Sequence, residues 1–285
     1  MRAVVLGLVV ACAGSHTPAA GDLLRLRTDG TIAAMAGDVV TCITKLERAA
    51  ELDPRSIGDA YDAAACHARK GELDAAFRGL DRAIARGLHA LEELEADPDF
   101  APLHRDARWP GVAQRVKQQL AVHLTRVNVE LHQIVSEDQK ARTGDFMSGD
   151  IQEFAARDAA RLVRVKAIIA AGGAKVSDDY YNAALVAQHG ETPDDYRMAR
   201  TLALKAVELD PENREALWLA AAATDRELVN LGKPQRFGTQ SMAGDDHIFK
   251  MRPVDPAVSD AERARWNVRS LADQQHLLDA MNKGK

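Results

Sequence analysis

The feature that most constrains the fold is an internal period of 34 residues near the start of the chain. Gly37 recurs as Gly71 and Leu46 recurs as Leu80, in the same register. A period of this length is typical of stacked two-helix units, each of which buries its apolar face on the next. The repeat therefore predicts antiparallel helical hairpins.

This segment resembles the tetratricopeptide repeat. Residues 61–71 read Tyr-Asp-Ala-Ala-Ala-Cys-His-Ala-Arg-Lys-Gly, a helix whose small side chains allow close packing, and Asp53-Pro54 ends the first copy where that family has its proline. The resemblance implies a scaffold for protein interaction over residues 31–111. A third copy would place Pro110 where Ala76 stands, so we expect the repeat to stop there.

Fewer than three such repeats cannot normally bury a continuous core, so we expect the pair to dock on a second domain. The aromatic segment after the repeat is expected to cap its core through Phe100, Leu103 and Trp109. Cys42 and Cys66 fall at similar heights on consecutive helices. Two alternatives remain for these cysteines: a disulfide between them, or two small buried thiols. Spacing does not decide between them, because it does not fix which way the side chains face.

The N-terminus predicts export. Met1-Arg2 and the apolar residues 3–11 form a signal-like segment that is too short for a permanent membrane span. Val-Val-Ala-Cys at 9–12 resembles the lipobox of bacterial lipoproteins, which implies lipidation at Cys12; a plain secretory signal is the alternative. We expect residues 12–30 to be a flexible tether, and the protein to lie in the periplasm or at the outer membrane.

Composition favours helix over sheet and gives no sign of nucleic-acid binding. Ala, Leu, Glu, Asp and Arg dominate, aromatic residues make up 5%, and the net charge of −5 comes from interspersed acids and bases. The expected partner is an envelope protein or peptide, with membrane contact through the lipid anchor only. No metal-ligand or phosphate-cradling motif is present, so we expect no metal and no cofactor.

The second half of the chain reads as helices. Apolar spacing predicts one long helix from Val112 to about Arg142, whose first part, 112–125, bridges to a helical domain at 126–285. Thr192-Pro193 opens a later helix, and Gly244 centres a short β-hairpin. The expected fold is all-α: a short helical hairpin repeat plus a helical C-terminal domain with one small hairpin.

One helix of this domain ends in an unusual polar loop. Asp225 falls on the apolar stripe of the helix from Leu217 to Leu231, so its carboxylate must find a hydrogen-bond or charge partner. Residues 232–240 then read Gly-Lys-Pro-Gln-Arg-Phe-Gly-Thr-Gln. This loop offers many donors and acceptors with no evident packing role.

The loop belongs to a longer signature. Together with a Gln-His pair at 188–189 and an Asp-Arg pair at 225–226, it resembles a bacterial domain family of unknown function. The resemblance locates a candidate site without naming a reaction. The candidate catalytic residues are His189, as general base, and Asp225, as the group that orients it. The candidate ligand-binding residues are Asp138, Gln139, Arg142, Gln188, Arg226, Gln235, Thr239 and Gln240.

Three functions are compatible with these residues. The first is an envelope lipoprotein that binds a polar ligand or peptide at the loop. The second is a hydrolase or transferase that uses His189. The third is a structural adaptor in which His189 only caps its helix and the loop only braces the helices.

Overall fold

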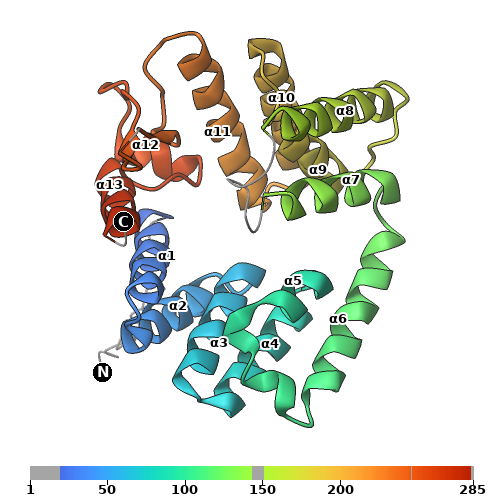
Figure 1. The fold of residues 1–285 in the computed structure, drawn as a ribbon, viewed down its shortest axis with the longest axis vertical. Helices are drawn as coiled ribbons and strands as arrows, with labels where there is room; N and C mark the ends of the chain where they lie inside the picture. The colour runs from blue at the N-terminus through green and yellow to red at the C-terminus, as the bar shows by residue number, and fades with distance from the viewer. Residues whose placement is uncertain (1–19, 143–150, 245, 284–285) are drawn as a thin grey trace, which may run out of the picture.

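The structure is a computed structural model of the chain, and it describes residues 20–142, 151–244 and 246–283. Within these ranges it contains thirteen α-helices and a single two-stranded antiparallel sheet (Figure 1). The expected fold class, all-α with one small hairpin, is confirmed.

The first half of the chain is a series of antiparallel helices in which each packs on the one before it. Small side chains allow this: a Cβ on Gly79 would lie 2.6 Å from the Cβ of Ala64, so the helices that carry them touch through their backbones. The elements are α1 (Ala20–Met35), α2 (Val39–Leu52), α3 (Ile57–Lys70), α4 (Leu73–Ala85), α5 (Leu91–Ala96), the 3-10 turns η1 (Pro98–Phe100) and η2 (Leu103–Arg105), and α6 (Trp109–Leu124).

The tether expected at residues 12–30 is wrong for its second part. Residues 20–30 belong to α1, because Leu24 and Thr28 are buried in the fold and Gly30 lies directly against Leu46 of α2. Cys12 and the signal-like segment lie outside the described residues. The expected caps, Phe100 and Leu103, are fully buried in the core of α3 and α4, and Trp109 packs against that core.

The single long helix expected from 112 to 142 is also wrong. The chain forms two helices, α6 and then α7 (Val129–Lys140). Asn128 separates them: its side chain caps α7 by accepting the N–H of Leu131, and its own backbone N–H donates to the carboxylate of Asp179 at 2.6 Å. Apolar spacing alone did not reveal this break, because Asn128 interrupts the helix through a partner 51 residues away.

Ion pairs at a spacing of 34 residues join α6 to α4. Arg108 and Arg115, at the start of α6, form ion pairs with Asp74 and Asp81 of α4, and both pairs are 34 residues apart. Pro110 does not prevent this, because it lies in the first turn of α6, where proline removes no helical hydrogen bond. Thus α6 contacts α4, with these two ion pairs across the contact.

The second half repeats the local pattern of the first. The sequence Glu-Leu-Asp-Pro ends α2 at 51–54 and α10 at 208–211, and in both places an alanine-rich helix follows. The elements are α7, α8 (Ile151–Ala170), α9 (Ser177–Ala187), α10 (Pro193–Leu209), α11 (Arg214–Asn230), β1 (Ser241–Ala243), β2 (Phe249–Met251), α12 (Asp260–Arg265) and α13 (Leu271–Asn282).

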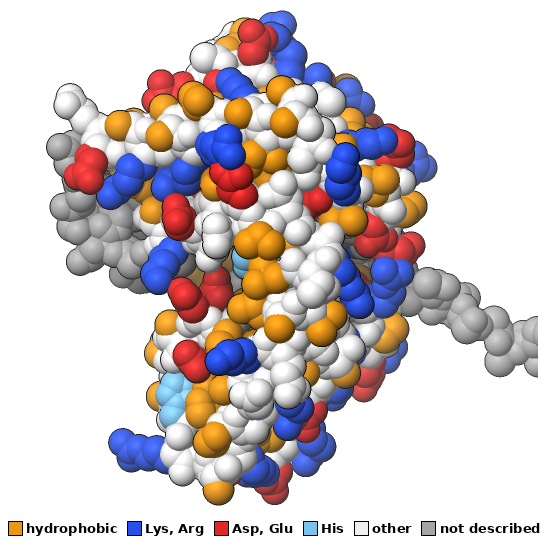
Figure 2. All heavy atoms as spheres, turned by 90° about the vertical axis from the view of Figure 1, so that its right-hand side faces the viewer, with side chains coloured by type: hydrophobic (Ala, Val, Ile, Leu, Met, Phe, Trp, Pro, Cys, Tyr) orange, Lys and Arg blue, Asp and Glu red, His pale blue; other side chains and the backbone are white. Residues whose placement is uncertain are grey.

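The first and last described helices lie side by side. Figure 1 shows α1 against α12 and α13, while α6 and α7 connect the two halves on the other side. Arg269 donates a hydrogen bond from Nε to the hydroxyl of Thr28 at 2.8 Å, and Arg25 lies 3.7 Å from Asp273. On the face shown in Figure 2, acidic and basic side chains are interspersed.

Cys42 and Cys66 form a disulfide in the structure. Their Cα atoms are 6.1 Å apart, and the bond joins α2 to α3. Both residues are buried with Ala33, Leu46 and Ala63 in a small apolar cluster. Of the two outcomes that spacing left open, the structure therefore contains the disulfide.

Three histidines meet where the two halves join. The rings of His89 and His123 are stacked with centroids 3.9 Å apart, and the ring of His132 lies 5.3 Å from His123. Burial lowers the pKa of His123 to about 4, and the neighbouring His89 and His132 act in the same direction. The carboxylate of Asp178 lies 3.7 Å from Nδ1 of His123. The charge of Asp179 raises the pKa of His123 in part, while Arg126 lowers it further.

We therefore expect acid to loosen this junction. The folded-state pKa of His123 is below its ordinary value of 6.5, so the unfolded chain takes up the proton first as the pH falls. Stability should be lost as the pH falls from 6.5 toward 4, and about 2 kcal/mol of this loss from His123 should be reached at pH 5. Urea unfolding at pH 7 and pH 5 would measure the loss, and His123→Gln should reduce it. An equal loss in the variant would contradict this origin.

Candidate functional site

The carboxylate of Asp225 holds the polar loop. It is fully buried, and its Oδ1 accepts the backbone N–H groups of Arg236 at 2.7 Å and Phe237 at 2.9 Å. Its Oδ2 accepts the N–H and the hydroxyl of Thr239 at 2.9 and 2.8 Å. The expectation that this carboxylate must find hydrogen-bond partners is confirmed, and the partners are backbone groups of the loop.

Gln235 braces the loop from inside. Its side chain is fully buried: Oε1 accepts the N–H of Gln240, and Nε2 donates to the carbonyl oxygens of Gln240 and Arg252. The side chain of Gln240 donates to the hydroxyl of Thr239. Gln235 is therefore not accessible to a ligand in this structure, and the loop is held by its own polar groups.

His189 is paired with a different carboxylate from the one expected. Its Nδ1 lies 3.1 Å from Oδ2 of Asp138, on α7, whereas the oxygens of Asp225 are occupied by the loop. The contact does not meet the geometric criteria of a hydrogen bond, so His189 Nδ1 is a buried polar atom that lies close to the carboxylate without a formed bond. The pairing of His189 with Asp225 is thus wrong, because packing brings α9 against α7.

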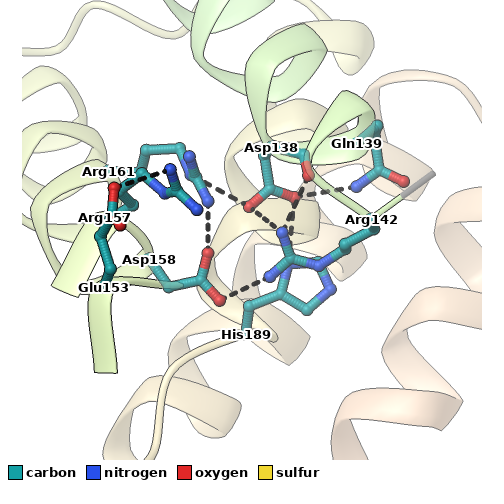
Figure 3. A network of polar contacts seen from close by, with 8 residues as sticks. All are labelled: Asp138, Gln139, Arg142, Glu153, Arg157, Asp158, Arg161 and His189. Atoms are coloured by element: carbon teal, nitrogen blue, oxygen red, sulfur yellow. Dashed lines mark hydrogen bonds and ion pairs between the residues drawn. The ribbon is translucent and has the colours of Figure 1, made fainter. Parts of the chain in front are cut away.

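Asp138 is the centre of a polar network (Figure 3). It is fully buried and accepts hydrogen bonds from Arg142 at 2.9 Å and from Gln139 at 2.9 Å. Arg161 approaches the same carboxylate to 3.3 Å. Four sequence candidates, Asp138, Gln139, Arg142 and His189, therefore do meet in space.

Two residues of α8, Asp158 and Arg161, join Asp138 and Arg142 in this network, and they were not among the candidates (Figure 3). Asp158 accepts hydrogen bonds from Arg142 at 2.7 Å and from Arg161 at 2.5 Å (Figure 3). The three-residue spacing of Asp158 and Arg161, on one face of a helix, was the available signal. It was not specific, since exposed faces of other helices carry similar pairs.

The pKa values of both members of this buried pair lie below their ordinary values, for different reasons. Burial raises the pKa of the Asp138 carboxyl, but His189, Arg142 and Arg161 outweigh burial and hold that pKa below its ordinary value. Burial lowers the pKa of His189, and the Asp138 carboxylate offsets this only in part. The imidazole of His189 is therefore neutral and the carboxyl of Asp138 ionised at neutral pH.

A pocket of about 420 Å³ opens beside this network. Its most unusual member is Arg226, which makes no hydrogen bond or ion pair with any described residue and whose Nε is buried. Burial lowers the pKa of the Arg226 guanidinium, and Arg142 adds to the effect. The residues that line the pocket are Arg142, Phe154, Asp158, Gln188, His189, Gly190 and Arg226.

The pocket has the chemistry of an anion site. Its lining carries two guanidiniums, one carboxylate and one imidazole, and Arg142 is already paired with Asp138 and Asp158. The guanidinium of Arg226 is left without a counter-charge among the described residues. A buried cation without a partner is costly, and a bound carboxylate or phosphate would supply that partner.

The sequence candidates therefore divide between two places. Arg142, Gln188, His189 and Arg226 line this pocket, with Asp138 and Gln139 behind it. Thr239 lines a different pocket, with Gly238 and Ser241. Helix α11 contributes to both places, because Asp225 points to the loop while the adjacent Arg226 lines the pocket of His189.

Comparison of the chain with models of known protein families and with curated proteins gave no match. In the part of the chain that the structure describes, no helix is long and apolar enough to cross a bilayer. Within the same residues, no group of three or more His, Cys, Asp or Glu side chains is placed to hold a metal ion.

Proposed function

We propose that the protein binds a small anionic ligand, with a carboxylate or phosphate group, in the pocket of Arg226 and His189. The observation that carries this proposal is the guanidinium of Arg226, which pairs with none of the residues that the structure describes and whose Nε is buried, in the wall of an open pocket. Gln188 and His189 add polar groups at the same wall, and Phe154 supplies an apolar surface. Pockets that combine apolar surface with a few convergent polar groups are the usual form of ligand sites.

We further propose that this pocket is carried by an envelope lipoprotein whose helical hairpins support protein interaction. The support is the sequence: the signal-like residues 1–11 with Cys12, and the 34-residue register. Two ion pairs between residues 34 apart join α6 to α4, and they support the proposal that the helices of the first half form one stacked surface. Binding of a ligand in the second half and of a protein by the first half are compatible roles.

Calorimetric titration of the protein with inorganic phosphate and with succinate tests the anion site. We expect saturable binding, and Arg226→Gln should weaken it about tenfold or more, because a charge-assisted hydrogen bond is lost. Arg214→Gln, an exposed arginine on the same helix, is the matched control and should bind as the unaltered protein does. If neither anion binds, or if both variants bind equally well, the proposal is wrong.

The same titration should depend on pH. The pKa of free His189 lies below its ordinary value of 6.5, and a bound anion would raise it by stabilising the imidazolium. Binding therefore takes up a proton, and affinity should rise as the pH falls from about 7.5 to about 5.5. In His189→Gln this rise should be smaller. A rise of the same size in the variant would exclude His189 from the site.

A hydrolase or transferase is the second candidate. One observation favours it: His189 faces a pocket as a neutral imidazole with a carboxylate at its Nδ1, which is the arrangement of a general base and its positioning group. In this function Asp138 has the role that the sequence assigned to Asp225. Turnover of a bound ester or phosphate ester that His189→Gln abolishes, while binding persists, would favour the enzyme over the binding protein.

A further inference from the structure

A second pocket, of about 200 Å³, lies between the polar loop and the last helix. Trp218 of α11, Met281 of α13 and Met251 of β2 contribute apolar walls, and Thr239 and Arg269 contribute polar groups. This pocket has no residue in common with the pocket of His189. A ligand in this pocket would therefore touch none of the residues of the proposed anion site.

The wall formed by the loop is held in place before any ligand arrives. Thr239 is fixed by two hydrogen bonds to the buried Asp225. Gly238 has a φ of +86°, and a Cβ on it would lie 2.7 Å from the side chain of Leu271, so the loop packs directly against α13. A preorganised wall loses little conformational entropy when a ligand binds.

The apolar walls are accessible at the mouth. Trp218 is 37% exposed and Met281 is 36% exposed, whereas Leu278 beneath them is 8% exposed. Single exposed apolar residues are ordinary, but here two of them line one pocket. Its volume suits one apolar side chain and is too small for a folded segment.

Arg269 gives the pocket its charge. Its Nε donates to the hydroxyl of Thr28, and it forms no ion pair with any residue that the structure describes. Burial lowers the pKa of its guanidinium, and Arg27 acts in the same direction, while Asp273 opposes them. Asp273 already accepts the hydroxyl of Ser270 at 2.6 Å and lies near Arg25. The guanidinium of Arg269 therefore remains open to an external carboxylate.

We propose that this pocket binds the C-terminal residue of a peptide, with the carboxylate on Arg269 and an apolar side chain between Trp218 and Met281. A peptide fits better than a free amino acid, because the lining contains no acidic side chain to pair with an α-ammonium group. A peptide instead has an amide N–H at that position, which the hydroxyl of Thr239 or Ser241 can accept.

Fluorescence and calorimetric titration of the full chain with three probes tests this site: acetyl-Gly-Gly-Leu with a free carboxylate, the same peptide as its C-terminal amide, and free leucine. We expect the acid to bind and to change Trp218 emission, the amide to bind about tenfold more weakly, and free leucine to bind more weakly than the acid. Equal binding of acid and amide, or no saturable binding of the acid, would overturn the proposal. Tighter binding of free leucine than of the peptide would overturn the choice of a peptide.

Two variants locate the binding. Arg269→Gln should weaken binding of the peptide acid about tenfold and leave binding of the peptide amide nearly unchanged. Arg265 is an exposed arginine of α12, and Arg265→Gln should change the affinity for neither peptide. Since Arg269 also contacts Thr28, Met281→Glu provides a second variant at a partly exposed site that does not depend on this contact. This variant places a negative charge at the mouth of the pocket, so it should weaken binding of the peptide acid more than binding of the peptide amide. Unchanged affinity for the acid in both variants would place the binding elsewhere.

Discussion

Replacing Asp225 with alanine is expected to lower the free energy of unfolding by about 4 kcal/mol. The change would leave the backbone N–H groups of Arg236, Phe237 and Thr239 without their acceptor, in a region where Phe237 is 1% exposed. Water can reach such donors only if the loop opens. Urea denaturation followed by circular dichroism would measure the effect.

Asp225→Asn is the informative companion variant. It keeps the size of the side chain and one carbonyl acceptor, so it should lose less stability than alanine but more than a surface substitution. Asp279→Ala is the control, because Asp279 is an exposed helical residue that accepts a single hydrogen bond from Gln275. A loss for Asp225→Ala as small as the loss for Asp279→Ala would show that the loop does not depend on the buried carboxylate.

Removing the Cys42–Cys66 disulfide should cause the second largest loss in the free energy of unfolding. The bond closes a loop of 24 residues between α2 and α3. Chain entropy of the unfolded state then predicts a loss of about 3 kcal/mol in Cys42→Ala/Cys66→Ala. Thermal unfolding of the oxidised protein and of the double variant would measure the difference.

Reduction provides the internal control for this prediction. With dithiothreitol the unaltered protein should approach the stability of the double variant, and the variant itself should be insensitive to the reductant. If the unaltered protein unfolds at the same temperature with and without reductant, the disulfide does not contribute the expected stability.

Local features of the fold were predictable because their causes are local. Thr192 with Pro193 opens α10, Ser259 caps α12 and Ser270 caps α13, each through hydrogen bonds within one helical turn. The hairpin β1–β2 is also local, with Ser241 paired to Met251. Where a boundary depended on a distant partner, as at Asn128 and Asp179, the prediction failed.

Most of the candidate site could be named but not assembled. Sequence indicated His189, Arg142 and Arg226, and these residues do line one pocket. It placed Thr239 in the same cleft, whereas Thr239 lines the other pocket. Residues on adjacent positions of α11 point in different directions, and only the packing of the other helices decides what each direction meets.

The sequence by itself determined the all-α fold class, the caps of α10, α12 and α13, the 34-residue spacing and the need of Asp225 for partners, because each of these follows from composition or from spacing along one chain segment. Only the tertiary structure decided which carboxylate lies next to His189 and that Arg226 has no partner among the described residues. It also decided that the candidate residues line two separate pockets. These facts depend on how α7, α8, α9 and α11 are rotated against one another. That rotation is set by the combined packing of side chains far apart in sequence, which no local pattern records.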